Sequence, residues 1–251
     1  MKNYVIISPV KDEEKFVKLT IESVINQTIR PSQYIIVNDG STDNTEKIVG
    51  EYTRIYRWIK LINRKDRGKR LPGKGIVEAF YEGFHSISTS DWEYIVKLDS
   101  DLSFSPEYFE KIFEEFEKNP KLGIASGKTY IPINGDVNNL QIEATPKAHT
   151  RGASKIYKRQ CFEDIGGSKP VRGWDTIDDI SAMLNGYEVR SYKERILVHY
   201  RPMGSIEILK NWKKFSRQHG IDYYQLGYHP LFMIIKSIKF AFVRKPRIIF
   251  A

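Results

Sequence analysis

The sequence lacks the features that mark several large classes of protein. It has one cysteine, Cys161, which cannot form an intramolecular disulfide or build a cysteine-based metal site. It has no fixed-period repeat and no low-complexity segment, and no signal-peptide pattern precedes the first predicted strand. We therefore expect an ordinary globular protein of a reducing cytoplasm.

A glycine-rich phosphate loop is also missing. The first predicted strand, residues 4–8, is followed by Pro9-Val10-Lys11-Asp12, where a dinucleotide-binding fold has its glycine fingerprint. This turn argues against a nicotinamide-dependent enzyme and a P-loop NTPase. It also lacks the glycine- and arginine-rich first loop that is usual in nucleotidyltransferases.

What the chain does have is an excess of positive charge. Its 251 residues include 40 Lys+Arg against 31 Asp+Glu, a formal net charge of +9, within a globular composition of 41% hydrophobic residues. The basic residues gather at positions 64–74 and from 210 to the C-terminus. Such clusters suit anionic sugar nucleotides or anionic lipid. No recognition helix, zinc finger or aromatic RNA-binding pattern accompanies them, so we expect no nucleic-acid partner.

The first hundred residues predict alternating strands and helices. Asp12 is the expected N-cap of the first helix, whose apolar positions are Val17, Ile21 and Val24. The expected strands are 4–8, 34–38, 58–62 and 94–98. The second helix should end near residue 52, and the third should cover 76–86. This order predicts a parallel sheet with helices on both faces.

The next hundred residues continue the α/β pattern. We expect a helix opened by Ser105 and Pro106, a strand at 122–126, and a polar excursion at 128–149 with a turn at 134–136. A strand through 157, a short helix at 159–165 and a helix that ends at Asn185 should follow. The last expected strands are 189–192 and 196–200. The polar excursion is either an acceptor-binding region or a plain surface segment.

The last part of the chain differs in character. Residues 205–219 predict a basic helix and residues 231–243 an amphipathic one. The apolar run of the second helix is too short, and too interrupted by lysine, to span a bilayer. It either packs on the preceding domain or lies in a membrane interface with its basic flank on anionic lipid.

Two carboxylates follow the most apolar predicted strand. Asp99 and Asp101 come directly after residues 94–98. Residues two apart in an extended segment point to the same side, so the pair can converge on a hard cation or on the hydroxyls and phosphates of a ligand. The alternative is a solvated turn. The basic loop 64–75 is likewise either a solvated loop or a mobile clamp on a diphosphate.

These motifs together resemble the family 2 glycosyltransferases of GT-A fold, over residues 4–200. The matching segments are 8–14, 37–43, Asp99-Ser100-Asp101, Gly166-Gly167 and an acidic cluster that opens a late helix. The resemblance implies an α/β, Rossmann-like, mixed and mainly parallel sheet flanked by helices. It also implies a catalytic domain at 1–203, with a nucleotide-sugar half at about 1–103 and an acceptor half at about 104–203, followed by a C-terminal helical extension at 204–251.

The resemblance implies a role for each matching residue. Pro9, Glu13 and Asp39 would contact the base and ribose, and Asp99 the ribose. Independently of the resemblance, Lys74 is expected to bind the nucleotide sugar as part of the basic loop. Asp101 would hold a divalent metal, Mn or Mg, on the diphosphate.

Two further positions carry over with alternatives. His199 matches a metal- or diphosphate-contacting histidine of some members, or is a buried structural histidine. Arg151 is either a substrate contact or a surface arginine.

The general base should come from the late acidic cluster, where Asp175, Asp178 and Asp179 compete. If Asp175 caps the helix and Asp178 supports its first turn, Asp179 is left as the base. The spacing back from Gly186 favours Asp175 instead.

The sequence thus predicts an inverting, metal-dependent transferase. It would move a sugar from a nucleotide-diphosphate sugar to a glycan or lipid-linked hydroxyl at the cytoplasmic membrane face. The alternatives are a nucleotidyltransferase, or a non-catalytic, membrane-peripheral nucleotide- or glycan-binding protein of the same fold.

Overall fold

The chain forms two compact units, Met1–Tyr200 and Arg201–Ala251, in a computed structural model. The structure describes residues 2–68, 71, 73–143, 146–201, 217, 220–224 and 227–243. The predicted boundary after residue 203 lies outside the described residues.

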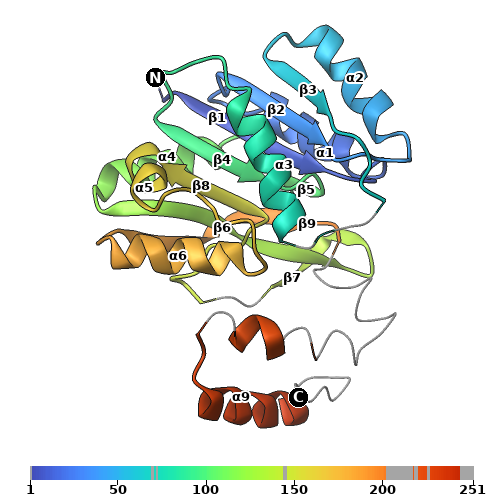
Figure 1. Ribbon diagram of the computed structural model, residues 1–251. Coiled ribbons are helices and arrows are strands. Elements are labelled where there is room, and N and C mark those ends of the chain that lie inside the picture. Colours follow the sequence, from blue (N-terminus) through green and yellow to red (C-terminus); the bar gives the residue numbers. More distant parts are fainter. Residues whose placement is uncertain are drawn as a thin grey trace. The chain divides into compact units, whose positions relative to one another are not determined.

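The first half of the larger unit is a four-stranded parallel sheet. Its elements follow the predicted order: β1 (Tyr4–Val10), α1 (Val17–Ile25), β2 (Gln33–Asn38), α2 (Thr45–Ile55), β3 (Ile59–Asn63), α3 (Lys74–His85) and β4 (Tyr94–Leu98). The strands lie in the order β3-β2-β1-β4, all parallel, and α3 crosses in front of them in Figure 1. The carboxyl ends of β1, β2 and β4 therefore meet at one edge.

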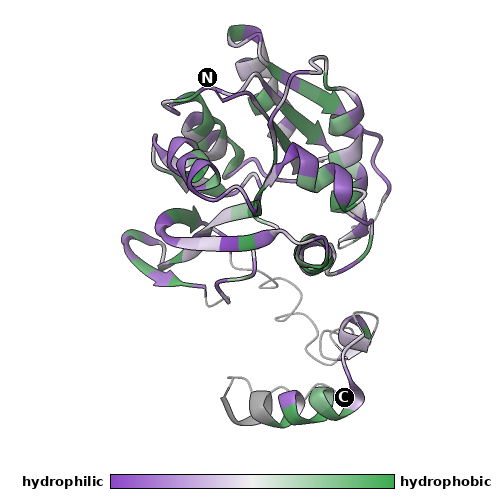
Figure 2. Ribbon diagram, turned by 90° about the vertical axis from the view of Figure 1, so that its left-hand side faces the viewer, coloured by the Kyte–Doolittle hydropathy of each residue, from purple (hydrophilic) through white to green (hydrophobic). Residues whose placement is uncertain are grey.

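The sheet is covered on both faces, and the strand sequences show why. Along β1, Tyr4 and Ile6 belong to a core cluster with α1 and α4, while Val5 and Ile7 belong to a second cluster with α3, α5 and α6. Because successive side chains point to opposite faces, a strand buried on both sides must be apolar at nearly every position. Figure 2 shows this apolar interior under more polar helices.

The second half adds strands of mixed direction. Its elements are β5 (Leu102–Phe104), α4 (Tyr108–Lys118), β6 (Leu122–Ile133), β7 (Asp136–Ile142), β8 (Ser154–Lys158), α5 (Arg159–Asp164), α6 (Trp174–Leu184) and β9 (Glu188–His199). The sheet continues β4-β8-β6-β9-β5, with β8 antiparallel to both its neighbours and β9 parallel to β6. The predicted mixed α/β sheet is confirmed.

The polar excursion is a β-hairpin. Strands β6 and β7 pair across a turn in which Asn134 and Gly135 both have positive φ, 54° and 80°. Two such residues close a tight hairpin with the twist of its strands. The two strands expected at 189–192 and 196–200 are one element, β9, whose register shifts opposite Gly127 and Lys128.

Two predicted helix starts are wrong. Helix α1 begins at Val17, because Asp12 has a φ of 56° and its carboxylate accepts a hydrogen bond from the Thr42 amide (2.9 Å) in place of capping a helix. Helix α4 begins at Tyr108, two residues after Pro106, with no side-chain cap.

The smaller unit holds the predicted amphipathic helix, α9 (Pro230–Val243). Leu231, Ile234, Ile235 and Ile238 are exposed along it, and most of its described part is green in Figure 2. The Lys236 ammonium lies 4.0 Å from the ring centre of Tyr223. No helix among the described residues is long and apolar enough to cross a bilayer. The helix predicted at 205–219 lies mostly outside the described residues.

Candidate active site

The residues assigned to the base and ribose meet at the carboxyl ends of β1 and β2. Pro9 pairs with Val37, and the Asp39 amide donates to the Val10 carbonyl at 2.8 Å. Glu13 is buried in the turn after β1, and its amide donates to the hydroxyl of Thr45 at 2.7 Å. Parallel pairing thus brings the two polar turns together.

The basic loop folds back onto Asp39. Arg64 Nη1 lies 2.8 Å from Asp39 Oδ1, and Arg67 Nη2 donates to Oδ2. Arg67 also pairs with Glu78 at 2.5 Å, and Lys74 lies 3.7 Å from the same carboxylate. The loop therefore brings two guanidinium groups to Asp39, and guanidinium is the cation best suited to bidentate contacts with phosphate.

The centre of the site is at the end of β4. The ammonium of Lys97, a buried side chain, pairs with Asp99 and donates to the Gly152 carbonyl at 2.5 Å. The amide of Asp99 donates to the Ala153 carbonyl at 2.7 Å. One third of the Asp99 side chain, 32%, remains exposed. Asp99 is thus anchored on one side and open to a ligand on the other.

Asp101 begins a buried row of charges. Strand β5 pairs with β9 so that Leu102 lies opposite His199, which places His199 Nε2 3.5 Å from Asp101 Oδ2. His199 Nδ1 lies 3.2 Å from Glu143, and Glu143 pairs with Arg151 at 3.1 Å. Burial by itself lowers the pKa of His199, but contacts with Asp101 and Glu143 outweigh it and raise that pKa to about 10.

Asp101 and His199 fit a divalent cation as a partial ligand set. Both side chains are buried and close together, and they supply one hard oxygen and one imidazole nitrogen. Among the described residues, no three His, Cys, Asp or Glu side chains gather to hold a metal. A cation here would need further oxygen ligands, and Mg²⁺ in proteins commonly takes one or two carboxylates plus substrate phosphates.

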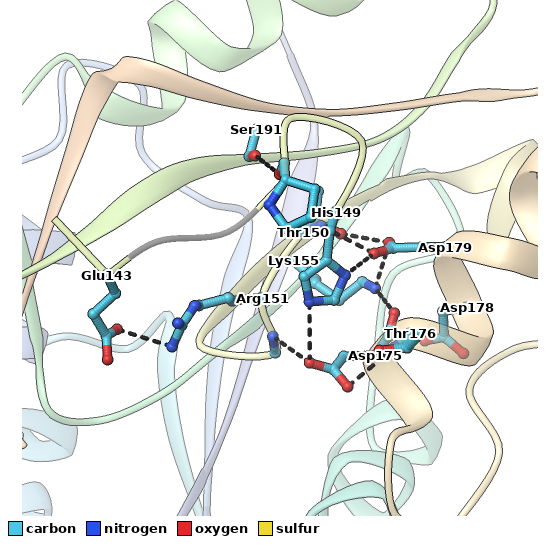
Figure 3. A network of polar contacts seen from close by, with 12 residues as sticks. Glu143, His149, Thr150, Arg151, Lys155, Asp175, Thr176, Asp178, Asp179 and Ser191 are labelled. Carbon is cyan, nitrogen blue, oxygen red and sulfur yellow. Dashed lines mark hydrogen bonds and ion pairs between the residues drawn. The ribbon is translucent and has the colours of Figure 1, made fainter. Parts of the chain in front are cut away.

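The three aspartates of α6 have different surroundings (Figure 3). Asp178 is buried and accepts hydrogen bonds from Tyr157 and Ser168, both at 2.6 Å. Burial raises the pKa of Asp178, since Lys155 and these two donors do not fully offset it.

Asp179 is buried among four donors. It accepts from His149 Nδ1 (2.6 Å), the Thr150 amide (2.9 Å) and hydroxyl (2.6 Å), and Lys155 Nζ (2.7 Å). Burial alone would raise the pKa of Asp179, but Lys155 and the hydrogen bonds lower it. Its four acceptor positions are occupied.

Asp175 is the accessible member of the three. Its side chain is 27% exposed, and Oδ2 accepts one hydrogen bond, from the Gly152 amide at 3.3 Å. The expectation that it caps α6 is wrong, because Gly173 is the N-cap and no side chain caps this helix. Helix capping therefore gives no reason to prefer Asp179 as the base.

Residues 149–153 join these groups. His149 and Thr150 contact Asp179, Arg151 contacts Glu143, and the backbone of Gly152 and Ala153 contacts Asp175, Lys97 and Asp99. One short segment thus contacts both Asp175 and Asp179 of α6 (Figure 3) and the residues at the end of β4.

Several residues of this network were not predicted, among them the charged residues Lys97, Glu143 and Lys155 and the histidine His149. One of them left a signal in the sequence, because Lys97 is a charged residue within an otherwise apolar strand, and such a residue needs a partner when buried. Lys155 lies in β8, where Ser154 and Lys158 are polar as well. Glu143 and His149 lie at the end of the polar excursion, where nothing distinguished them.

The fold and the site define a class of protein, the GT-A glycosyltransferase domain. The first half places polar turns at the carboxyl ends of its strands, and the second brings further carboxylates close to them. The chain belongs to glycosyl transferase family 2, whose family model matches residues 5–172. The resemblance seen in the sequence is confirmed.

Known proteins similar to this chain are glycosyltransferases. The poly-beta-1,6-N-acetyl-D-glucosamine synthase of Staphylococcus epidermidis is 27% identical over 209 residues, 74% of this chain and 47% of that protein. The chain thus spans about half the length of this curated relative.

Two solved structures share the fold. One is the mannosyltransferase PcManGT of Pyrobaculum calidifontis in complex with GDP-Man and Mn²⁺ (TM-score 0.62, 15% identity, 90% of this chain and 65% of that one). The other is residues 1–349 of S. aureus TarS in complex with UDP-GlcNAc (TM-score 0.61, 17% identity, 88% and 66%).

Proposed function

We propose that this chain transfers a sugar from a nucleotide-diphosphate sugar to a hydroxyl of a glycan or lipid-linked acceptor, with inversion at the anomeric carbon. The observation that carries the proposal is that Asp99 and Asp175 both contact the backbone of residues 152–153. The amides of Gly152 and Asp99 make the two contacts, at 3.3 and 2.7 Å. A donor-side carboxylate and an accessible carboxylate therefore face one site.

The donor would lie along the carboxyl ends of the parallel strands. Pro9, Glu13 and Asp39 would contact the base and ribose, and Asp99 the ribose. Arg67 and Lys74 would approach the diphosphate from the basic loop. Ligands of open α/β sheets bind outside these strand ends, which supports this placement.

Asp101 and His199 would hold the divalent cation, Mn²⁺ or Mg²⁺. When bound, such a cation compensates the negative charge that develops on the departing nucleoside diphosphate. The imidazole can bind a cation only when it is neutral at the binding nitrogen, so metal and proton compete for His199.

Asp175 would be the general base. It is partly exposed and accepts a single hydrogen bond outside its own turn, whereas Asp178 and Asp179 are buried among donors. A base must reach the hydroxyl whose proton it removes. The spacing back from Gly186 favours the same residue.

The base assignment is tested with three matched variants. We expect Asp175→Asn to lower kcat by about 10²- to 10⁴-fold without changing donor affinity, because it removes only proton transfer. Asp178→Asn should act mainly through stability, and Asp179→Asn should lower stability by breaking the buried pair with Lys155. An Asp175→Asn variant with wild-type kcat would exclude this residue as the base.

The donor is tested with a panel of nucleotide sugars. UDP-GlcNAc is the first choice, since a relative makes an N-acetylglucosamine polymer and a structural neighbour was crystallised with this donor. GDP-Man is the second. Release of nucleoside diphosphate in the presence of Mn²⁺, lost after chelation, is the expected result.

The products separate the rival functions. Nucleotidyl transfer out of such a donor moves the nucleoside monophosphate and releases sugar 1-phosphate in place of nucleoside diphosphate. A binding protein without activity retains the donor unchanged. Either result, obtained with every donor of the panel, would overturn the transferase proposal.

The smaller unit would hold the protein on the cytoplasmic face of a membrane. Residues 201–251 contain ten Lys+Arg and two Asp+Glu, a net +8, whereas residues 1–200 contain 30 and 29, a net +1. Together with the exposed apolar positions of α9, this charge fits a helix lying on anionic lipid.

A further inference from the structure

The imidazole of His149 connects two of the three α6 aspartates. Its Nδ1 lies 2.6 Å from Oδ2 of buried Asp179, and its Nε2 lies 4.0 Å from Oδ2 of Asp175. Figure 3 shows the ring between the two carboxylates. The proposed function uses Asp175 alone and leaves this arrangement unexplained.

Asp179 fixes the tautomer of the ring. Lys155, fully buried, pairs with it at 2.7 Å, and Thr150 donates to it twice. These contacts keep Asp179 ionised, and an ionised carboxylate only accepts hydrogen bonds. Nδ1 of His149 must therefore carry the hydrogen, which leaves Nε2 of the neutral ring with a lone pair on the side of Asp175.

We propose that His149 receives the acceptor's proton from Asp175, with Asp179 as the residue that positions the ring. This relay rests on the proposed function and assigns a role to the two residues next to its base. Asp179 is then a positioning residue.

The steps balance in atoms and charge. The acceptor oxygen forms its bond to the anomeric carbon as the bond from that carbon to the diphosphate oxygen breaks, and the nucleoside diphosphate keeps the electron pair. The hydroxyl proton passes to Asp175 Oδ2 and from there to His149 Nε2. The resulting imidazolium keeps its Nδ1 hydrogen bond to Asp179.

The geometry suits the second transfer. A separation of 4.0 Å exceeds a hydrogen bond but leaves no room for an intervening water, so a small side-chain rotation brings the atoms into contact. Such contacts commonly tighten when substrate binds. The His149 side chain is 23% exposed, which gives the proton a path to solvent after the reaction.

The tautomer is tested first, by nuclear magnetic resonance on the full chain with ¹⁵N-labelled histidine. The chain has five histidines, and His149→Asn identifies the signal of interest. We expect His149 to carry its hydrogen on Nδ1 in the wild type and to lose this preference in Asp179→Asn. A hydrogen on Nε2 in the wild type would overturn the relay.

Kinetics test the transfer itself. In His149→Asn the amide nitrogen occupies the place of Nδ1, so the hydrogen bond to Asp179 is kept while the proton-accepting nitrogen is lost. We expect kcat to fall about 10- to 100-fold with donor KM unchanged. His85→Asn, at an exposed position at the end of α3, is the matched control and should leave both constants unchanged.

Two outcomes separate the relay from the proposed function. If the wild type is active and His149→Asn has the same kcat, the ring has only a structural role and the relay alone is wrong. If the wild type turns over no donor in the panel, the proposed function is wrong and the relay with it.

Discussion

Two buried lysines pair with carboxylates on either side of the site. Lys97 contacts Asp99 at the end of β4, and Lys155 contacts Asp179 from β8. Removing one partner of a buried pair leaves an uncompensated charge, so neither residue of the pair can be replaced alone without a loss of stability. These charges fix the positions of Asp99 and Asp179.

Lys155→Met should destabilise the protein strongly. We expect a loss of about 3–5 kcal/mol in the free energy of unfolding, because Asp179 stays buried without its cation. Urea denaturation measures it. Lys118→Met, which removes an exposed partner of Glu115, should change that free energy by less than about 0.5 kcal/mol. Equal effects of the two variants would contradict the buried-pair argument.

The protonation of His199 should make the stability of the protein depend on pH. Its pKa is raised from 6.5 to about 10 in the folded protein, so folding favours the protonated ring. This contribution to stability is complete below pH 6.5 and is lost as the pH rises from 6.5 toward 10. In His199→Gln, urea midpoints measured across that range should fall less steeply than in the wild type. Parallel curves for the two proteins would refute the assignment.

At the scale of elements, α3 owes its position to one glycine. A Cβ atom at Gly83 would lie 2.6 Å from Cγ2 of Ile7 and 3.0 Å from Cγ2 of Val37, so the helix backbone packs directly on β1 and β2. Helix α3 begins at the end of the basic loop, and its position therefore also places Glu78 where Arg67 pairs with both Glu78 and Asp39.

Gly83→Ala and Gly50→Ala make a matched pair. Both replace a helical glycine, which by helix propensity alone stabilises by about 0.5–1 kcal/mol. Gly50 has open space around its Cβ position and should show this gain, whereas Gly83→Ala should destabilise by about 1–3 kcal/mol through overpacking. Thermal and urea unfolding measure both. A stabilised Gly83→Ala would mean that α3 does not pack this closely.

At the scale of the whole molecule, charge is divided between the two units. The larger unit is almost neutral, and the smaller one carries a net +8 of the total +9. A cluster of this kind binds anionic surfaces and is screened by salt. The net positive charge of this protein therefore lies almost entirely in its smaller unit, and it does not indicate what the larger unit binds.

Truncation after Tyr200 tests this division. The full chain should bind vesicles with anionic lipid and lose most of that binding between about 0.05 M and 0.5 M salt, and it should not bind neutral vesicles. The truncated chain, which retains both core clusters, should bind neither and still release nucleoside diphosphate. Equal vesicle binding by both chains would place the membrane contact in the larger unit.

Most of the elements could be predicted because they depend on local pattern. The strands buried on both faces are continuous apolar runs, and the Asn134-Gly135 turn has its own backbone preference. Helix starts were less predictable, because Asp12 could cap a helix or accept hydrogen bonds from a distant turn, and only the distant Thr42 decides between these.

The sequence by itself determined the fold family and the edge of the sheet where the site lies. Strand order and direction place the turns after β1, β2 and β4 together, whatever side chains they carry. Asp99 and Asp101 were predicted from their place after the strand at 94–98, and Asp39 from the resemblance to the family.

Only the tertiary structure distinguished among the aspartates of α6. Asp175, Asp178 and Asp179 are neighbours in sequence, and their differences come from residues far along the chain: Gly152 beside the first, Tyr157 and Ser168 around the second, His149 and Lys155 around the third. Burial and hydrogen bonding decide which carboxylate is accessible, and both are set by packing between elements, which local sequence does not specify.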